Sequence, residues 1–138
     1  MVAASSPAYM LDTNICIYAM NGHISVLKKF KEHGRELLGI SSLVLAELAF
    51  GVAKSRRVAE NTDALQRFQA GFRVHAWDVA AIWYYGEHCQ RLKSTGRTIG
   101  EIDLLLGCQA LAMDAIFVTN NTREFERIEG LKLENWVA

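Results

Sequence analysis

Near its amino terminus the sequence reads Ala8-Tyr9-Met10-Leu11-Asp12, a short apolar run that ends in an acid. Consecutive apolar residues bounded by a polar residue are typical of a buried strand, so this run predicts a strand with Asp12 at its carboxyl end. A second run, Ala115-Ile116-Phe117-Val118-Thr119, is the clearest strand of the sequence. Both runs are therefore expected to lie inside the protein.

Helix and strand signals alternate in the rest of the chain. We expect helices over residues 14–20, 24–33, 42–54, 59–70, 79–95, 102–113 and 124–128, and further strands over 37–40, 73–76 and 131–133. This order predicts an α/β domain with a mostly parallel central sheet of about four to five strands and helices on both faces. Because there is no internal repeat or linker, we expect a single domain over residues 1–138, with its core in residues 9–136.

The composition is that of a globular protein, with 138 residues, 51% of them hydrophobic and 22% charged. Fifteen basic and fifteen acidic residues give no net charge, so bulk charge does not indicate a nucleic-acid partner. The three cysteines lie far apart in apolar runs, which predicts buried, reduced thiols in a cytoplasmic protein. Residues 1–8 do not have the pattern of a secretory signal, and no apolar run is long enough to predict a membrane span.

Four acids occupy positions where chemistry is expected in an open α/β sheet, beyond the carboxyl ends of the strands. Asp12 follows the first strand, and Glu47 lies early in the helix after the second. Asp103 opens the apolar helix before the last clear strand, and Glu124 opens the short helix after it. We therefore expect the four carboxylates to converge.

Converging carboxylates repel one another, and burial increases the cost, unless a cation lies between them. Mg²⁺ and Mn²⁺ prefer such oxygen ligands, so the pattern indicates a divalent-metal site. Each acid also has a simpler structural interpretation. Asp12 could cap a helix, Glu47 could pair with an arginine, Asp103 could interact with its helix dipole and Glu124 could lie on the surface.

Four stretches together carry a family resemblance: residues 10–15 (Met-Leu-Asp-Thr-Asn-Ile), 40–51, 96–103 (Gly-Arg-Thr-Ile-Gly-Glu-Ile-Asp) and 118–128. They resemble the motifs of PIN-domain nucleases, specifically the VapC toxins of bacterial toxin–antitoxin pairs, over residues 9–136. The resemblance implies a Mg²⁺- or Mn²⁺-dependent endoribonuclease whose catalytic acids are Asp12, Glu47, Asp103 and Glu124. The first three would bind the metal directly, and Glu124, with its longer arm, would do so through water.

The resemblance also implies partners. Proteins of this kind are usually homodimers that a VapB-like antitoxin inhibits by inserting its carboxyl-terminal segment into the acidic groove. They contact operator DNA only through that antitoxin. Relatives with this type of first and last motif tend to cut tRNA, often initiator tRNA in the anticodon loop. Two positions depart from many relatives, because Thr98 and Glu101 stand where prolines are frequent. We interpret Glu101 as a bystander because residues two apart on a helix face different ways.

Further candidates surround the acids. Hydroxyls and amides that could orient a carboxylate or a water are Thr13, Asn14, Ser41, Thr119, Asn120 and Asn121. Capping or turn formation explains Asn14, Ser41 and Asn121 equally well. Cations that could contact RNA phosphates are Lys54, Arg56, Arg57, Arg97 and Arg123, although a solvated basic surface is an equal alternative for each.

Two other classes can gather acids in an α/β fold. A receiver-like signalling module binds Mg²⁺ without nuclease activity, but it needs a phosphorylatable Asp after a central strand, which the middle strands lack. A phosphatase of the haloacid dehalogenase type normally has a second Asp two residues after its nucleophile, where this chain has Asn14. The nuclease is the favoured interpretation.

Overall fold

The computed structural model describes residues 6–137, which form one parallel sheet with helices on both faces. The strand order across the sheet is β3-β2-β1-β4-β5. The strand bounds are β1 (Tyr9–Leu11), β2 (Leu38–Ser41), β3 (Arg73–His75), β4 (Ile116–Val118) and β5 (Leu133–Glu134). All neighbouring strands pair in parallel, so the predicted α/β architecture is confirmed.

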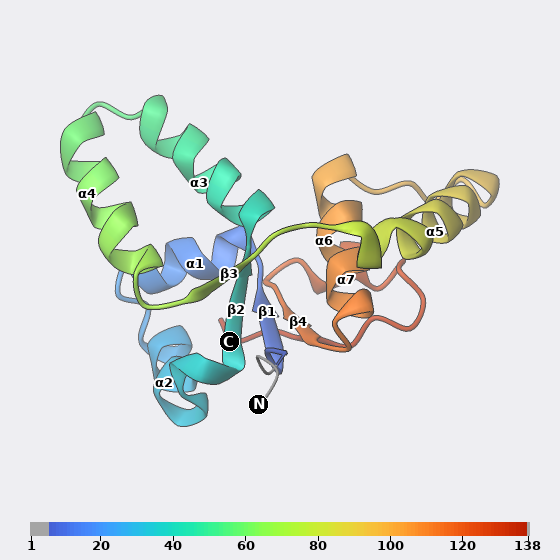
Figure 1. Ribbon diagram of the computed structural model, residues 1–138, viewed down its shortest axis with the longest axis horizontal. Coiled ribbons are helices and arrows are strands. Elements are labelled where there is room, and N and C mark those ends of the chain that lie inside the picture. Colours follow the sequence, from blue (N-terminus) through green and yellow to red (C-terminus); the bar gives the residue numbers. More distant parts are fainter. Residues whose placement is uncertain (1–5, 138) are drawn as a thin grey trace.

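The helices form two groups on opposite sides of the sheet (Figure 1). On one side lie α1 (Thr13–Met20), α2 (Ile24–His33), α3 (Ser42–Ala53) and α4 (Val58–Gln69), and on the other lie α5 (Ile82–Ser94), α6 (Glu101–Ala112) and α7 (Thr122–Phe125). Short 3₁₀ helices, Arg35–Leu37 and Val79–Ala81, precede β2 and α5. Connections between parallel strands are right-handed, so the face that a connecting helix covers depends on the direction in which the chain moves across the sheet. The two groups of helices therefore follow from the strand order.

The chain adds strands first on one side of the central strand β1 and then on the other. From β1 it moves to β2 and β3, and it then crosses to the opposite side of β1 to form β4 and β5. β1 pairs with β4 in a register that places Leu11 beside Val118. The carboxyl ends of β1 and β4 therefore form the switch point where open α/β sheets bind ligands, and the next residues, Asp12 and Thr119, meet there.

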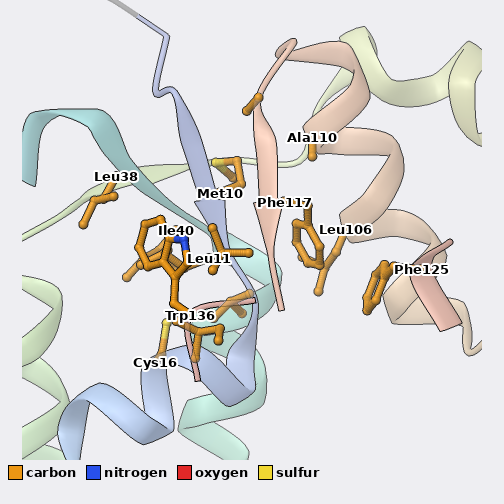
Figure 2. Packing of buried hydrophobic residues seen from close by; sticks show 14 of the residues in the cluster. Met10, Leu11, Cys16, Leu38, Ile40, Leu106, Ala110, Phe117, Phe125 and Trp136 are labelled. Atoms are coloured by element: carbon orange, nitrogen blue, oxygen red, sulfur yellow. The ribbon is translucent and has the colours of Figure 1, made fainter. Parts of the chain in front are cut away.

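The core lies on both faces of the central strands (Figure 2). Leu11, Ile40, Phe117 and Val118 are almost completely buried, which explains why their strands read as continuous apolar runs. Helix α6 is buried along most of its length, and Gly107 permits its close approach to the turn after α7. A Cβ atom at this glycine would lie only 2.3 Å from Cδ1 of Ile128.

Three predicted boundaries were wrong. The helix expected from residue 79, with Asp78 as its cap, begins only at Ile82, because the Asp78 carboxylate accepts a bond from the Ala80 N–H and caps the 3₁₀ turn that precedes α5. α7 begins at Thr122, so Glu124 lies inside this helix rather than opening it. The last strand begins at Leu133, because the Leu131 N–H bonds back to the Ile128 carbonyl in a turn.

Cys16, Cys89 and Cys108 are free thiols, as expected, but only Cys16 and Cys108 are buried; Cys89 is half-buried on α5. Among residues 6–137 no helix has both the length and the apolar character that a membrane span requires. The prediction that residues 1–8 form no secretory signal falls largely on residues 1–5, which lie outside the described part of the chain.

Candidate active site

Asp12 occupies the centre of the switch point and is only 5% exposed. Its Oδ1 accepts a hydrogen bond from the Thr13 N–H at 2.8 Å, so it does cap α1. Its Oδ2 accepts a second bond, from the Thr119 hydroxyl at 2.7 Å. The carboxylate is therefore held from β4 as well as from its own helix, an arrangement that capping alone does not require.

Glu47 approaches the same region from α3, the helix that follows the neighbouring strand β2. Its Oε1 accepts a hydrogen bond from the Thr13 hydroxyl at 2.6 Å. The alternative of an ion pair with an arginine finds no support, because the ion pairs of the described residues do not include Glu47. Thr13 thus links Glu47 to Asp12 through one residue, by its N–H and its hydroxyl.

Asp103 and Glu124 form a carboxyl pair between α6 and α7. A hydrogen bond joins the two side chains, and it raises the pKa of Asp103 and lowers the pKa of Glu124. Glu124 also accepts bonds from the Gly100 N–H at 3.1 Å and from the Asn121 side-chain amide at 2.8 Å. Asp103 lies in the first turn of α6, and α3 and α6 both begin at the same edge of the sheet (Figure 1). The start of α6 therefore lies on the same side as the strand end before Asp12 and the start of α3, the helix that carries Glu47.

The electrostatics of the site reflect four negative groups close together. Burial raises the pKa of Asp12, and the charges of Glu47 and Glu124 raise it further, against the lowering effect of its hydrogen bonds. Burial and then the charges of Asp12 and Glu124 raise the pKa of Asp103 to about 7. The hydrogen bonds from Gly100 and Asn121 lower the pKa of Glu124. Such mutual repulsion marks a site that is short of positive charge.

The donor set fits a hard divalent cation by its chemistry. It consists of carboxylate oxygens supported by hydroxyl and amide groups, the ligand type that Mg²⁺ and Mn²⁺ prefer. Within residues 6–137, however, no three acidic, imidazole or thiol side chains already converge tightly enough to hold an ion among themselves. Mg²⁺ commonly keeps several waters and uses only one or two carboxylates, so it does not need a closed cage of side chains.

The other predicted supporting residues play three different parts. Thr13, Thr119 and Asn121 bond directly to the acids, and the Asn121 N–H also bonds to the Thr119 hydroxyl at 2.9 Å. The Asn14 side chain accepts a bond from the Asn120 N–H at 3.3 Å and so joins α1 to the end of β4. Ser41, by contrast, caps α3 through the Leu43 N–H, as its alternative interpretation predicted.

The predicted RNA-binding cations are divided between two places. Lys54, Arg56 and Arg57 lie at the far end of the α3–α4 hairpin, away from the start of α6 (Figure 1). There Lys54 lies over the Phe50 ring and Arg57 pairs with Glu60. Arg97 and Arg123 are exposed and lie within a few residues of the Asp103–Glu124 pair along the chain. Only the second group is close to this pair along the chain.

Two features were missed by the sequence interpretation. The first is Arg127, whose guanidinium donates to the Thr98 carbonyl at 2.8 Å and whose charge lowers the pKa of Glu124. The sequence signal that could have indicated Arg127 is its spacing of three residues from Glu124, which would place the two side chains close together on a helix. The second is an apolar groove of about 300 Å³ between α1, α3 and α4, which Glu47 borders at the side of the acids. Its apolar walls include Ile17, Met20, Leu48, Val52 and Leu65.

The fold and site define a parallel α/β domain with a carboxylate cluster at its switch point, and comparison with known proteins identifies the family. The PIN domain family matches residues 9–131. The chain belongs to the PIN domain family. It is 42% identical over 135 residues to a protein of Rickettsia felis named Ribonuclease VapC2, a match covering 93% of this chain and 97% of the relative. It is 38% identical over 129 residues to a Shigella flexneri protein named tRNA(fMet)-specific endonuclease VapC, with the same coverage.

Solved structures agree with this assignment. The chain matches a protein in the crystal structure of VapBC2 from Rickettsia felis bound to a promoter DNA fragment, with a TM-score of 0.85, 40% identity and coverage of 93% and 98%. It matches one in the DNA-bound VapBC structure from Salmonella typhimurium with a TM-score of 0.89, 31% identity and coverage of 94% and 98%. The resemblance to PIN-domain proteins of the VapC type is thus confirmed.

Proposed function

We propose that this protein is a Mg²⁺- or Mn²⁺-dependent endoribonuclease and the toxin of a toxin–antitoxin pair. The observation that carries the proposal is the cluster of carboxylates at the switch point, where Asp12 is buried and Asp103 has a raised pKa, and the ion pairs among residues 6–137 include neither of them. A divalent ion would relieve this repulsion and, when bound, would activate water and stabilise the charge that develops on the phosphate. Relatives named as VapC ribonucleases support the assignment.

The side chains have distinct roles in this proposal. Asp12, Glu47 and Asp103 would hold the ion, and Glu124 would act on it through water. Thr119 holds the buried carboxylate of Asp12 in one orientation by its short hydrogen bond, which is what a metal ligand needs from its neighbours.

The Asp103–Glu124 pair would also handle protons. Burial and the nearby carboxylates raise the pKa of Asp103 to about 7, and binding of a cation would lower this pKa and favour release of a proton. The pair is thus a place where a proton can be released and taken up during turnover.

We propose tRNA as the substrate, with the anticodon loop of initiator tRNA as the cleavage site. The relative from Shigella flexneri, at 38% identity, is named for tRNA(fMet) and supports this choice. Arg97 and Arg123 are exposed cations close to Asp103 and Glu124 along the chain, and they would contact RNA phosphates. Since tRNA is cytoplasmic, we place the protein there as well.

We propose that a VapB-like antitoxin inhibits the enzyme by occupying the apolar groove beside Glu47. The groove would bind apolar side chains of a partner segment, and its acidic end would attract a basic residue. The matching structures from Rickettsia felis and Salmonella typhimurium are VapBC complexes with DNA, which supports such a partner and DNA contact through it.

We also propose a homodimer that buries the apolar surface around the start of α5. Trp83 is 84% exposed and Val79 is 76% exposed, and Ile82 and Tyr84 are exposed beside them. Large apolar side chains grouped in this way on a folded surface indicate contact with another protein surface.

The decisive experiment is cleavage of purified tRNA by the wild-type protein, with Mg²⁺ and with EDTA. We expect cleavage with the metal only, and a loss of at least about 100-fold in the Asp12→Asn variant. Asp78→Asn is the matched control, because Asp78 caps a 3₁₀ turn outside the site. Full cleavage in EDTA or by Asp12→Asn would refute the proposal. Labelling of the protein by acetyl phosphate would instead support the receiver-like alternative, although the strand order here differs from the 2-1-3-4-5 order of receiver domains.

A further inference from the structure

The loop between α5 and α6 is attached at two points to residues 124–127, which comprise the end of α7 and the turn after it. The Arg127 guanidinium donates to the Thr98 carbonyl at 2.8 Å, and the Gly100 N–H donates to Glu124 at 3.1 Å. These bonds join segments that are 29 and 24 residues apart in the sequence. They are therefore tertiary contacts that neither helix can form alone.

This loop controls where Asp103 lies. Gly100 is the N-cap of α6 and has no side chain with which to cap the helix, but its own N–H donates to the Glu124 carboxylate and fixes the start of the helix against α7. Asp103 stands in the first turn of α6, and its Oδ2 lies 3.4 Å from the position that a Cβ of Gly100 would occupy. A shift of the loop would consequently move Asp103 relative to Glu124.

We propose that Arg127 is a positioning residue, which fixes the loop over residues 96–100 and thereby sets the distance between the carboxylates of Asp103 and Glu124. The arginine does not bond to either carboxylate through a hydrogen bond or ion pair in the described residues. It acts through the Thr98 carbonyl. Glu124 lies in α7 and Arg127 in the turn directly after it, where the Arg127 N–H bonds to the Glu124 carbonyl at 3.2 Å, so one short segment carries both the arginine and the carboxylate.

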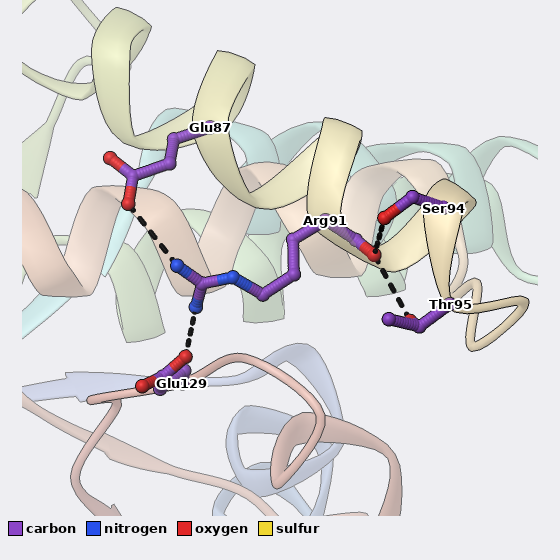
Figure 3. Close-up of polar contacts among 5 residues, drawn as sticks. All are labelled: Glu87, Arg91, Ser94, Thr95 and Glu129. Atoms are coloured by element: carbon purple, nitrogen blue, oxygen red, sulfur yellow. Dashed lines mark hydrogen bonds and ion pairs between the residues drawn. The ribbon is translucent and has the colours of Figure 1, made fainter.

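A second arginine supplies a matched control, because it joins neighbouring segments without reaching this loop. Arg91 on α5 pairs with Glu87 on the same helix and with Glu129, beyond α7 (Figure 3). Both arginines thus hold the α5 side of the molecule to the chain that follows β4. Loss of Arg91 tests general stability, whereas loss of Arg127 tests the position of the loop.

The first arm of the test measures amide hydrogen exchange and does not depend on nuclease activity. In Arg127→Gln we expect the amides of residues 97–100 to exchange at least about tenfold faster, since an untethered loop opens locally. Arg127→Lys can still donate to the Thr98 carbonyl and should retain most of the protection. Arg91→Gln should leave exchange in residues 97–100 within about twofold of the wild type. Unchanged exchange in Arg127→Gln would overturn the proposal.

The second arm measures tRNA cleavage and rests on the proposed nuclease function. We expect kcat to fall about 10- to 100-fold in Arg127→Gln with KM within about twofold, because misplaced groups lose rate rather than binding. Arg127→Lys should recover most of kcat, and Arg91→Gln should match the wild type. A rise in KM with unchanged kcat would overturn the proposal by showing direct RNA binding. If the wild type does not cleave RNA, the proposed function fails while the exchange arm still decides the role of Arg127.

Discussion

Replacing Asp103 with Asn removes a carboxyl group that the metal-free protein ionises only at a cost in stability. Burial and the charges of Asp12 and Glu124 raise its pKa from an ordinary 3.8 to about 7. The amide of Asn can donate to Glu124 without a titrating proton. We therefore expect Asp103→Asn to be more stable than the wild type in EDTA at neutral and alkaline pH.

The size of the effect follows from the two pKa values. The difference between 3.8 and about 7 corresponds to roughly 4 kcal/mol at 1.36 kcal/mol per pH unit. The side chain is partly exposed, and solvent screening reduces this figure, so we expect about 1–2 kcal/mol. For a chain of this length that gain raises Tm by about 3–8 °C.

The pH dependence has a defined sign. Between about pH 4 and pH 7 the folded wild type binds a proton that the unfolded chain releases, so the free energy of unfolding of the wild type falls as the pH rises. The stability advantage of Asp103→Asn is therefore near zero below pH 4 and reaches its full size above pH 7. Thermal unfolding in EDTA at a series of pH values measures this difference directly.

Glu101→Gln is the matched control, because Glu101 is an exposed acid in the same turn of α6. We expect its Tm to follow that of the wild type at every pH. The reasoning is refuted if Asp103→Asn is less stable than the wild type above pH 7, or if its advantage does not increase with pH. Addition of Mg²⁺ should reverse the order, since the wild type alone retains the full set of carboxylates.

Two further predictions concern single contacts. Thr119→Val removes the hydroxyl that bonds to Asp12 and should lower the free energy of unfolding, measured by chemical denaturation, by about 1–3 kcal/mol. Thr119→Ser keeps the hydroxyl and should retain most of this stability. Equal stability of the Val variant and the wild type would contradict the prediction. Gly107→Ala should cost about 1–3 kcal/mol, because its methyl group would collide with the buried Ile128. Gly51→Ala on α3, with open space around it, should instead gain up to about 1 kcal/mol, and a similar loss in both would refute the packing argument.

Most of the fold could be predicted because its signals are local. The apolar runs that became β1 and β4 correspond closely to the observed strands, and the helix expected over residues 24–33 coincides with α2. Boundaries failed where hydrogen bonds compete within a few residues, as at Asp78 and in the turn before Leu133. In such places several turns have similar energies, and residue type alone does not select one.

The candidate site was predicted in part for the same reason. Asp12 and Thr119 follow adjacent parallel strands, so their meeting is a direct consequence of the strand pattern. Lys54 and Arg57 form the densest cationic cluster in the sequence, yet they lie at the far end of a helical hairpin. Distance along the chain carried no information about distance in space once a helix of twelve residues intervened.

By itself the sequence determined the fold class and predicted four acids near the strand ends, because periodicity and strand ends express local physical preferences. Only the tertiary structure decided how those acids are paired. The change in the direction of strand addition at β1 brings α6 and α7 together, so that Asp103 forms a hydrogen bond with Glu124 and Arg127 tethers the loop before α6. These contacts join segments more than twenty residues apart, and their energies depend on burial and exact separation, which exist only after the chain has folded.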